Sequence, residues 1–237
     1  MNEISDGVVL LDKKRNNTAL IILYLVIFLQ IFIILLMCFF YVTVTDGESM
    51  ENTLQDKQLF IVQRLAFGLE HGDVITVNTA ADGEPEHMLI KRVIGLGGDK
   101  LLFMRSQSGG QIELYRRNYG ENKYTLLDEP YIKSAMSAAV NYYDTPICSY
   151  IPNLTEISID SENATAEQKK LFDDINAASV EIAHGSVYFM GDNRNNSLDS
   201  RYYGARPLSK VRGKLVKKLK INGFGDKFFR FVFSLND

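Results

Sequence analysis

Residues 19–44 read ALIILYLVIFLQIFIILLMCFFYVTV, and the stretch GESMENTL follows shortly afterwards at residues 47–54. The first run contains no charged residue. A helix of this length measures about 39 Å, which exceeds the roughly 30 Å hydrocarbon core of a bilayer. The sequence therefore predicts a transmembrane helix over residues 19–44, with Ser49 emerging within a few residues of the membrane surface.

The charges that precede this apolar run predict its orientation. Lys13, Lys14 and Arg15 stand in front of it, and such basic residues favour the cytoplasmic side of a membrane. Residues 1–18 are therefore expected to be a poorly ordered cytoplasmic tail, and residues 45–237 an extracytoplasmic domain. A cleavable signal peptide would have an apolar region of only about 7–15 residues and a small-x-small cleavage site. We therefore expect a single-pass anchor in the cell (cytoplasmic) membrane.

Composition narrows the classes of partner and cofactor. The 237 residues carry a formal net charge of -3, which argues against nucleic acid as a partner. The two cysteines, Cys38 and Cys148, fall in the apolar run and in the domain after it, so a disulfide between them is implausible. Residues 191–201 lack the alternating ligands and central glycine of a calcium loop. No metal and no other cofactor is expected.

Short runs rich in β-branched residues dominate the chain after the anchor. Strands are predicted over residues 58–63, 73–78, 88–94 and 187–190, and a hairpin over residues 101–115. Thr165-Ala166-Glu167-Gln168 has the spacing of a capping box and predicts one following helix. The expected fold is mostly β, with one or few short helices, plus one N-terminal transmembrane helix.

Two regions carry weaker signals. Residues 105–185 are expected to form a variable insertion in the domain. Residues 210–237 are basic and rich in leucine and phenylalanine, which suits a membrane-proximal tail on an anionic surface. A solvated basic edge with a few core phenylalanines fits the same pattern equally well.

Ser49 and Lys91 are candidate catalytic residues. A serine hydroxyl needs a nearby base to become a nucleophile, and a lysine can serve if burial lowers its pKa from about 10.4 by several units. Lys91 shares one strand face with Leu89 and Val93, and these apolar neighbours disfavour an ammonium group. The alternatives are a serine in an ordinary juxtamembrane linker and a lysine on a surface strand. The three histidines lie in loop-like settings and are expected to be exposed: His71, His87 and His184.

Residues 191–201 form a dense polar segment, GDNRNNSLDSR. Such side chains are typical of a supporting network that holds catalytic groups in place. Asp199 and Arg201 are expected to pair, and Ser197 to orient another group. A well hydrogen-bonded turn without a catalytic role is the alternative interpretation.

Four blocks of this sequence resemble, in their order, the type I signal peptidases, which are membrane-anchored serine proteases of the Ser/Lys dyad type. The blocks are GESMxxTL at residues 47–54, GDVI at 72–75, IKRVIGLxGD at 90–99 and GDNRxNSxDSRxxG at 191–204. The stretch DEPYI at residues 128–132 is similar to one that those enzymes often carry. The resemblance implies a β-rich catalytic core over residues 45–237 that cleaves signal peptides from exported preproteins, after small residues at positions -1 and -3.

The same resemblance implies roles for individual residues. Ser49 matches the nucleophile and Lys91 its general base. Ser197 matches the hydroxyl that hydrogen-bonds the lysine, and Met50 would help to shape the substrate groove. The supporting network would comprise Asp192, Arg194, Asp199 and Arg201. The implied partners are the signal peptides of secreted preproteins and the phospholipid bilayer.

The chain also departs from the family pattern. Asn52 and Gly97 stand where the family usually has proline, which predicts two looser turns, and Leu89 replaces a commoner tyrosine. Gly47 occupies a position that in some members is a serine whose hydroxyl helps to bind the oxyanion. With glycine there, the donors expected beside the Ser49 N–H are another backbone N–H or a water molecule.

Two other classes of function remain open. One is a self-cleaving Ser/Lys regulator, which would need a DNA-binding domain in place of the anchor. The other is a single-pass surface protein that binds a partner without catalysis, in which replacing Ser49 or Lys91 would leave the activity unchanged.

Overall fold

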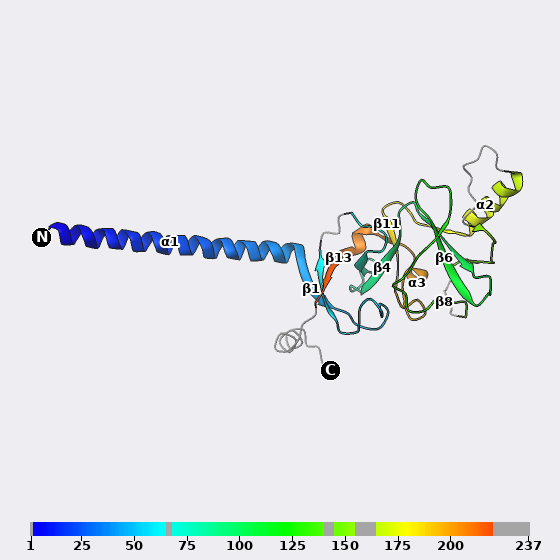
Figure 1. Ribbon diagram of the computed structural model, residues 1–237, viewed down its shortest axis with the longest axis horizontal. Helices are drawn as coiled ribbons and strands as arrows, with labels where there is room; N and C mark the ends of the chain where they lie inside the picture. Colours follow the sequence, from blue (N-terminus) through cyan, green and yellow to red (C-terminus); the bar gives the residue numbers. More distant parts are fainter. Residues whose placement is uncertain (1, 65–67, 140–144, 155–164, 220–237) are drawn as a thin grey trace. The chain divides into compact units, whose positions relative to one another are not determined.

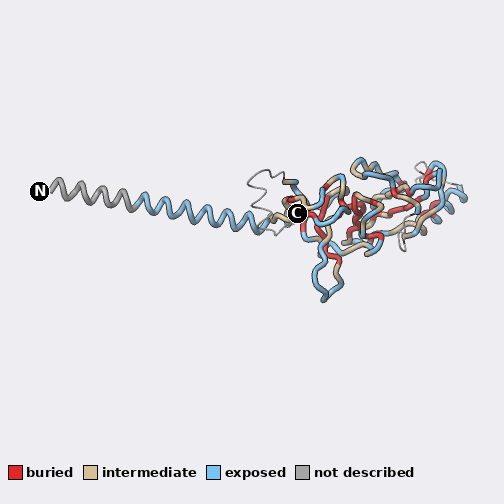
Figure 2. The backbone as a smooth tube through the Cα atoms, turned by 90° about the horizontal axis from the view of Figure 1, so that it is seen from below, coloured by how far each residue is buried: buried red, intermediate tan, exposed pale blue. Residues whose placement is uncertain are grey.

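The chain begins with one long helix, α1 (Asn2–Phe39). The structure, a computed structural model, describes residues 2–64, 68–139, 145–154 and 165–219, and for residues 2–16 the backbone alone. It comprises two units, Met1–Tyr41 and Val42–Asp237, which are described separately below. Within α1, Asn17–Phe39 is long and apolar enough to cross a membrane, and its side chains are exposed along its length (Figure 2).

The limits of α1 differ from the prediction at both ends. The helix starts at Asn2, because no proline interrupts residues 2–39 and helical hydrogen bonding continues through the expected tail. It ends at Phe39, and Phe40–Val44 form strand β1 instead of the last helical turn. Aromatic and β-branched residues favour an extended backbone, and β1 finds a pairing partner in β2. The remaining apolar part of the helix is still about 35 Å long.

The second unit contains a seven-stranded sheet with the order β1-β2-β13-β3-β4-β11-β12 (Figure 1). The further strands are β2 (Leu59–Gln63), β3 (Val74–Asn78), β4 (Met88–Leu96), β11 (Ser186–Met190), β12 (Arg206–Pro207) and β13 (Val211–Lys218). The register of β4 places Lys91 opposite Ile75 on β3 and Val93 opposite Phe189 on β11. Because β4 has a neighbour on each side, its backbone is paired and its central residues are buried.

Strand β13 changes the interpretation of the basic C-terminal segment. Val211–Lys218 pairs antiparallel with both β2 and β3, so this part of the expected tail is a strand inside the sheet. Two of its basic side chains reach acidic partners: Arg212 pairs with Glu86, and Lys214 with Asp73 at 2.7 Å. Residues 220–237, which complete the expected membrane-proximal tail, lie outside the described residues.

A second sheet occupies most of the expected insertion, with the order β10-β5-β6-β7 and with β8 and β9 paired to β6 and β5. Its strands are β5 (Lys100–Arg105), β6 (Gln111–Arg117), β7 (Thr125–Leu126), β8 (Met136–Ser137), β9 (Ile147–Cys148) and β10 (Val180–Glu181). The antiparallel pairing of β5 with β6 confirms the predicted hairpin. The capping box at Thr165 is also confirmed, and it starts α2 (Ala166–Ala178).

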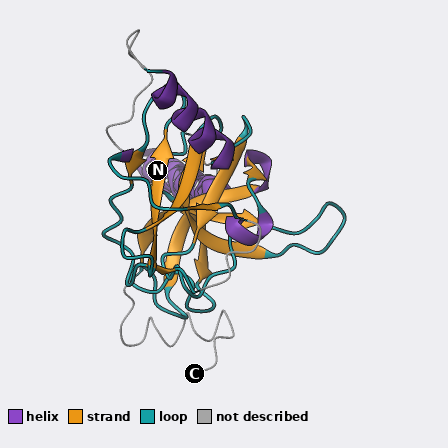
Figure 3. Cartoon of the chain, turned by 90° about the vertical axis from the view of Figure 1, so that its right-hand side faces the viewer, coloured by secondary structure: helices purple, strands orange, loops and turns teal. Residues whose placement is uncertain are grey.

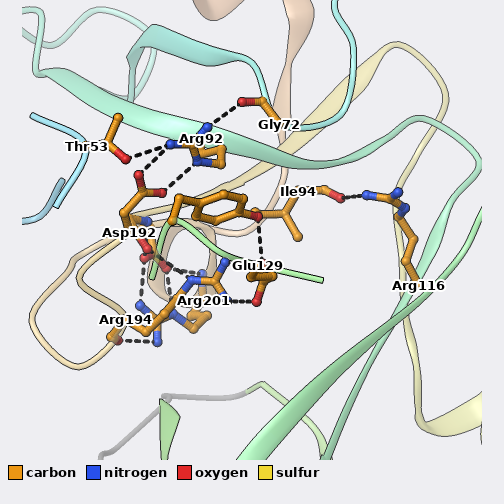
Figure 4. Close-up of polar contacts among 12 residues, drawn as sticks. Thr53, Gly72, Arg92, Ile94, Arg116, Glu129, Asp192, Arg194 and Arg201 are labelled. Carbon is orange, nitrogen blue, oxygen red and sulfur yellow. Dashed lines mark hydrogen bonds and ion pairs between the residues drawn. The ribbon is translucent and has the colours of Figure 1, made fainter. Parts of the chain in front are cut away.

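The two sheets pack on a shared apolar core. One cluster joins Ile94 of β4 and Tyr188 of β11 to Leu101 and Phe103 of β5. Arg116 of β6 strengthens the junction, because its guanidinium donates to the Ile94 carbonyl at 2.9 Å (Figure 4). Strands are the main regular secondary structure of the described unit, and its helices are short (Figure 3). The prediction of a mostly β fold with one apolar N-terminal helix is confirmed.

Candidate active site

Ser49 lies in a turn that follows β1 and is anchored by apolar side chains. The Met50 carbonyl accepts from the N–H groups of Thr53 and Leu54 at 3.0 and 2.9 Å. Met50 and Leu54 are almost fully buried and pack with Val74 of β3. Met50 therefore packs in the core beneath the turn and holds the loop on the sheet, and its contribution to a substrate groove stays a prediction.

Lys91 reaches this turn from the middle of β4. Its Nζ lies 2.6 Å from Ser49 Oγ, and the residue is only 2% exposed. Burial lowers the pKa of Lys91 to about 8, against the attraction of Asp199 and with a smaller contribution from Arg201. At neutral pH about one molecule in ten then carries the neutral amine. In that form the Ser49 hydroxyl donates and the amine accepts, which is the arrangement of a nucleophile with its base.

Arg92, the residue next to Lys91, joins three segments around the site. Its guanidinium makes two bonds to the Asp192 carboxylate, at 2.8 and 2.6 Å. It also donates to the Gly72 carbonyl at 2.7 Å and to Thr53 Oγ1 at 2.9 Å (Figure 4). Since Thr53 belongs to the Ser49 turn, one side chain fixes that turn, the Gly72 turn and the loop after β11 relative to β4.

The loop after β11 contains the expected Asp199–Arg201 pair. Arg201 donates twice to the Asp199 carboxylate, at 2.8 and 2.7 Å. Asp199 also accepts from the Gly191 N–H at 3.0 Å and caps the short helix α3 (Ser200–Tyr203). Burial alone would raise the pKa of Asp199, but these donors hold it below its ordinary value. The carboxylate therefore stays ionised next to the buried amine of Lys91.

The same loop contacts the nucleophile turn through its backbone. The Asn193 N–H donates to the Ser49 carbonyl at 3.0 Å, and the Asn193 side chain donates to the Glu48 carbonyl at 3.3 Å. A Cβ on Gly191 would stand 2.5 Å from the Ser49 carbonyl oxygen. Only glycine permits this close approach, which holds the two loops together.

Arg194 pairs with a residue that the sequence analysis did not single out. Its guanidinium makes two bonds to the Glu129 carboxylate, one of them at 2.6 Å, and its Nε donates to the Gly191 carbonyl at 3.1 Å. The Arg194 side chain is 0% exposed and that of Glu129 is 7% exposed. This buried pair links the DEPYI segment to the loop after β11.

Ser197 is not placed as the resemblance implies. Its hydroxyl oxygen is buried and has no hydrogen-bond partner within the described part of the chain. It lies close to Asp199 but without the alignment of a hydrogen bond. It also crowds Gly191, where a Cβ would stand 2.3 Å from Ser197 Oγ. A direct hydrogen bond from Ser197 to Lys91 is absent from the described contacts.

The departures from the family pattern have different structural consequences. Gly47 has a φ of 91°, which a serine would adopt only with strain, and its N–H donates to Asp56 at 2.8 Å. Asn52 also has a φ of 91°, which proline cannot adopt. Gly97 is not in a loose turn, because a Cβ there would stand 2.8 Å from the His184 Cα.

The histidines have partners of their own. His71 contacts Asp99 at 2.7 Å, His87 contacts Thr79 at 2.9 Å, and His184 packs edge to face with Tyr119. Lys91 is the titratable side chain that the structure brings to the Ser49 hydroxyl. Across the described residues, no group of three or more His, Cys, Asp or Glu side chains could hold a metal ion.

Sequence reasoning missed three residues near the site: Arg92, Glu129 and Tyr131. Arg92 had a local signal, since a charged residue in the middle of an apolar strand must be paired when it is buried. Glu129 and Tyr131 lie in the DEPYI stretch that the resemblance already included. Their partners are far away in sequence, with 65 positions between Glu129 and Arg194, so no local pattern assigns them a contact.

Comparison with known proteins identifies relatives of two kinds. Signal peptidase IB of Staphylococcus aureus (strain N315) is 29% identical over 172 residues, covering 71% of this chain and 72% of the relative. Signal peptidase I of Aquifex aeolicus is 26% identical over 187 residues and covers 70% of each chain. The mouse mitochondrial inner membrane protease subunit 1 is 24% identical over 181 residues, covering 75% of this chain and 68% of the relative.

Among solved structures, a signal peptidase I from Enterococcus faecalis aligns with 64% of this chain and 100% of its own, at 21% identity and a TM-score of 0.37. That score is too low to support an argument about the fold. The decisive match is to the family model for "Signal peptidase, peptidase S26", which covers residues 16–219 and therefore most of the chain. This chain belongs to the signal peptidase family, peptidase S26.

Proposed function

We propose that this protein is a membrane-anchored endopeptidase that removes signal peptides from exported preproteins, with Ser49 as the nucleophile and Lys91 as the general base. The family and its relatives support a membrane serine peptidase that removes signal peptides. The proposal adds the two residues to that activity. The observation that carries it is the 2.6 Å contact between Ser49 Oγ and the Nζ of Lys91, a residue that is only 2% exposed.

The proposed reaction follows from the state of the amine. Neutral Lys91 takes the proton of Ser49, and Ser49 Oγ attacks the scissile carbonyl to form a tetrahedral intermediate. The lysinium then protonates the leaving amine, which leaves an acyl-enzyme on Ser49. Lys91 next takes a proton from a water molecule, whose oxygen attacks the ester. The lysinium then returns this proton to Ser49 Oγ as the signal peptide is released. Burial is the main cause of the low pKa of this amine; the ionised Asp199 raises that pKa and the fixed charge of Arg201 lowers it.

The oxyanion needs hydrogen-bond donors near Ser49. We assign one to the Ser49 N–H, as in other acyl-transferring serine enzymes. The Gly47 N–H is already bonded to Asp56 and is not available as the second donor. Replacing Gly47 by serine would strain the turn, since its φ is 91°. The second donor is therefore another backbone N–H or water.

The anchor fits a substrate that is itself held in a membrane. A signal peptide places its apolar stretch in the bilayer, so an anchored enzyme and its substrate meet in the same layer. The basic residues before the apolar part of α1 support an orientation with the N-terminus in the cytoplasm and the catalytic unit outside. The bacterial relatives favour the cytoplasmic membrane, and the mouse relative makes the mitochondrial inner membrane the alternative. Fractionation of cells that express a tagged chain distinguishes the two.

The decisive experiment incubates the detergent-solubilised protein with a preprotein and sequences the new N-terminus. We expect one cut, after small residues at -1 and -3, that disappears in Ser49→Ala and in Lys91→Ala. Ser106→Ala is the matched control, because Ser106 is a buried serine in the β5–β6 hairpin, where it bonds to Ser108 at 3.0 Å. Cleavage that survives Ser49→Ala at the wild-type rate would contradict the proposal.

A further inference from the structure

One segment of the second sheet region contacts three of the segments that build the site. It comprises residues 129–137 and is called the strap here. The strap lies outside the two catalytic blocks, yet it is bonded to the Ser49 turn, to β4 and to the loop after β11. Each of these contacts joins residues that are far apart in sequence.

The contacts at the start of the strap are made by Glu129 and Tyr131. The Tyr131 hydroxyl donates to Glu129 at 2.8 Å, and Glu129 in turn binds Arg194. The ring of Tyr131 covers the guanidinium of Arg92, with 3.9 Å between the guanidinium carbon and the ring centre. One tyrosine therefore connects two of the buried arginines, Arg92 directly and Arg194 through Glu129.

Other contacts hold the strap along the rest of its length. The Asn52 side chain donates to the Tyr131 carbonyl at 3.4 Å, and Lys133 pairs with Glu51 at 3.2 Å. Asn195 completes the set, because its side-chain amide accepts from the Ser137 N–H at 2.9 Å and donates to the Ala135 carbonyl at 3.1 Å. The Ser49 turn and the loop after β11 are thus bonded to the same strap.

Arg92 is the point at which these contacts reach the reacting atoms. Its edge is saturated by Asp192, Gly72 and Thr53, and its face is covered by Tyr131. A guanidinium held at both its edge and its face has one orientation, and an aromatic ring over a desolvated cation is a favourable contact. Without the ring, water would reach that face and the guanidinium would be less firmly held.

We propose that Tyr131, supported by Glu129, is a positioning residue that keeps the Ser49 hydroxyl aligned with the Lys91 amine by fixing Arg92. The inference rests on the proposed peptidase function. It assigns no contact of Tyr131 with substrate. Its effect runs through Arg92 to Thr53 in the Ser49 turn and to Asp192, whose neighbour Asn193 bonds the Ser49 carbonyl.

The test compares kcat and KM for preprotein cleavage in Tyr131→Leu and Tyr131→Phe. Loss of the ring misaligns the nucleophile, so Tyr131→Leu is expected to lower kcat about 10-fold or more and to change KM less than about two-fold. Tyr131→Phe keeps the ring over Arg92 and is expected to retain kcat within about two-fold of the wild type. Rescue by phenylalanine separates an effect of the ring from one of the hydroxyl.

Tyr124→Leu is the matched control for loss of stability. Tyr124 is a buried tyrosine of the same region, and it packs on Phe172 of α2 and bonds Asn176, away from Ser49. We expect this variant to have a lower melting temperature and an unchanged kcat when it is assayed below that temperature. If Tyr131→Leu does not fold, Tyr131→Met, which also lacks a π face, takes its place with the same expected loss.

Three results would overturn the inference. They are a wild-type kcat in Tyr131→Leu, an equal loss of kcat in Tyr131→Phe, and an equal loss in the Tyr124→Leu control. The failure of the proposed function would look different, because wild-type protein would then show no cleavage that depends on Ser49. The Ser49→Ala assay therefore separates the two before any Tyr131 variant is compared.

Discussion

The two sheet regions of the catalytic unit differ in the kind of side chain that they bury. In the region of the second sheet, residues 100–183, the buried side chains are almost all apolar or aromatic; the polar exceptions among those described are Ser106 and the Glu129 side chain, which pairs with Arg194 of the other region. In the first-sheet region, charged side chains are buried beside the apolar core, and they gather around Ser49. These charges are Lys91, Arg92, Asp192, Arg194, Asp199 and Arg201.

The difference indicates that the charges buried around Ser49 lower the stability of the fold while they provide the groups that catalysis needs. A buried charge loses its hydration, and pairing restores only part of that free energy. Each buried arginine near the site has a carboxylate partner at close range. Lys91 differs from these arginines, because its hydrogen-bond partner is the Ser49 hydroxyl, at 2.6 Å, and not a carboxylate. Burial therefore lowers its pKa. Perturbed groups of this kind mark functional sites.

The largest expected effect comes from replacing Lys91 by a residue whose charge is permanent. Lys91→Arg should reduce cleavage to the level of Ser49→Ala, because a guanidinium keeps its proton at any working pH and cannot act as a base. Preprotein cleavage and a melting curve should be measured on the same sample, to separate loss of base from loss of fold. An active and folded Lys91→Arg protein would rule out the lysine base.

The next largest effect tests the buried pairing. Arg194→Met leaves Glu129 buried without its partner, and breaking such a pair costs about 3–5 kcal/mol of the free energy of unfolding. Denaturant unfolding measures this loss, and Glu129→Gln combined with Arg194→Met should recover most of it. In the second sheet, Lys100→Met removes a pair whose acidic partner, Glu181, is 67% exposed, so no resolvable change is expected there. An equal loss of unfolding free energy in Arg194→Met and in Lys100→Met would contradict the difference between the two regions.

A third prediction measures the stability that Lys91 costs. The folded pKa of about 8 lies below the ordinary value of 10.5, so between these values the unfolded chain binds more protons and wild-type stability rises with pH. Lys91→Met should therefore raise the free energy of unfolding by roughly 3 kcal/mol at pH 7. The gain should shrink toward zero near pH 10. A gain that does not vary with pH would mean that the amine is not perturbed.

The smallest effect is expected at Ser197. Its buried hydroxyl has no hydrogen-bond partner within the described residues, so Ser197→Ala should leave stability unchanged or raise it by up to about 1 kcal/mol. We expect kcat to fall less than about 10-fold, since the hydroxyl lies beside Asp199 without bonding Lys91. A kcat equal to that of the wild type would remove Ser197 from the supporting network.

Local patterns were sufficient to predict much of this fold. The β-branched runs predicted β2, β3, β4 and β11, and the Thr165 capping box predicted α2. These features depend on neighbours within a few residues. The basic segment that became β13 had no such pattern, because its place is set by pairing with β2 and β3, far away in sequence.

The contacts of the site also fall into two groups, those that a local sequence pattern predicted and those between residues far apart in sequence. Apolar residues on either side of Lys91 predicted its desolvation, and the spacing of residues 199–201 predicted the Asp199–Arg201 pair. The partner of Arg194 is Glu129, from another sheet region, and no local pattern encodes such a contact. The packing of Met50 with Val74 of β3 likewise joins residues that no local pattern brings together.

The pH dependence of kcat/KM tests the central claim most directly. If Lys91 is the base and its pKa is about 8, kcat/KM for preprotein cleavage should rise as pH increases and level off above an apparent pKa near that value. A profile already level at pH 7, with its rising limb near the ordinary pKa of a carboxylate or a histidine, would assign the proton transfer to another group and contradict the account.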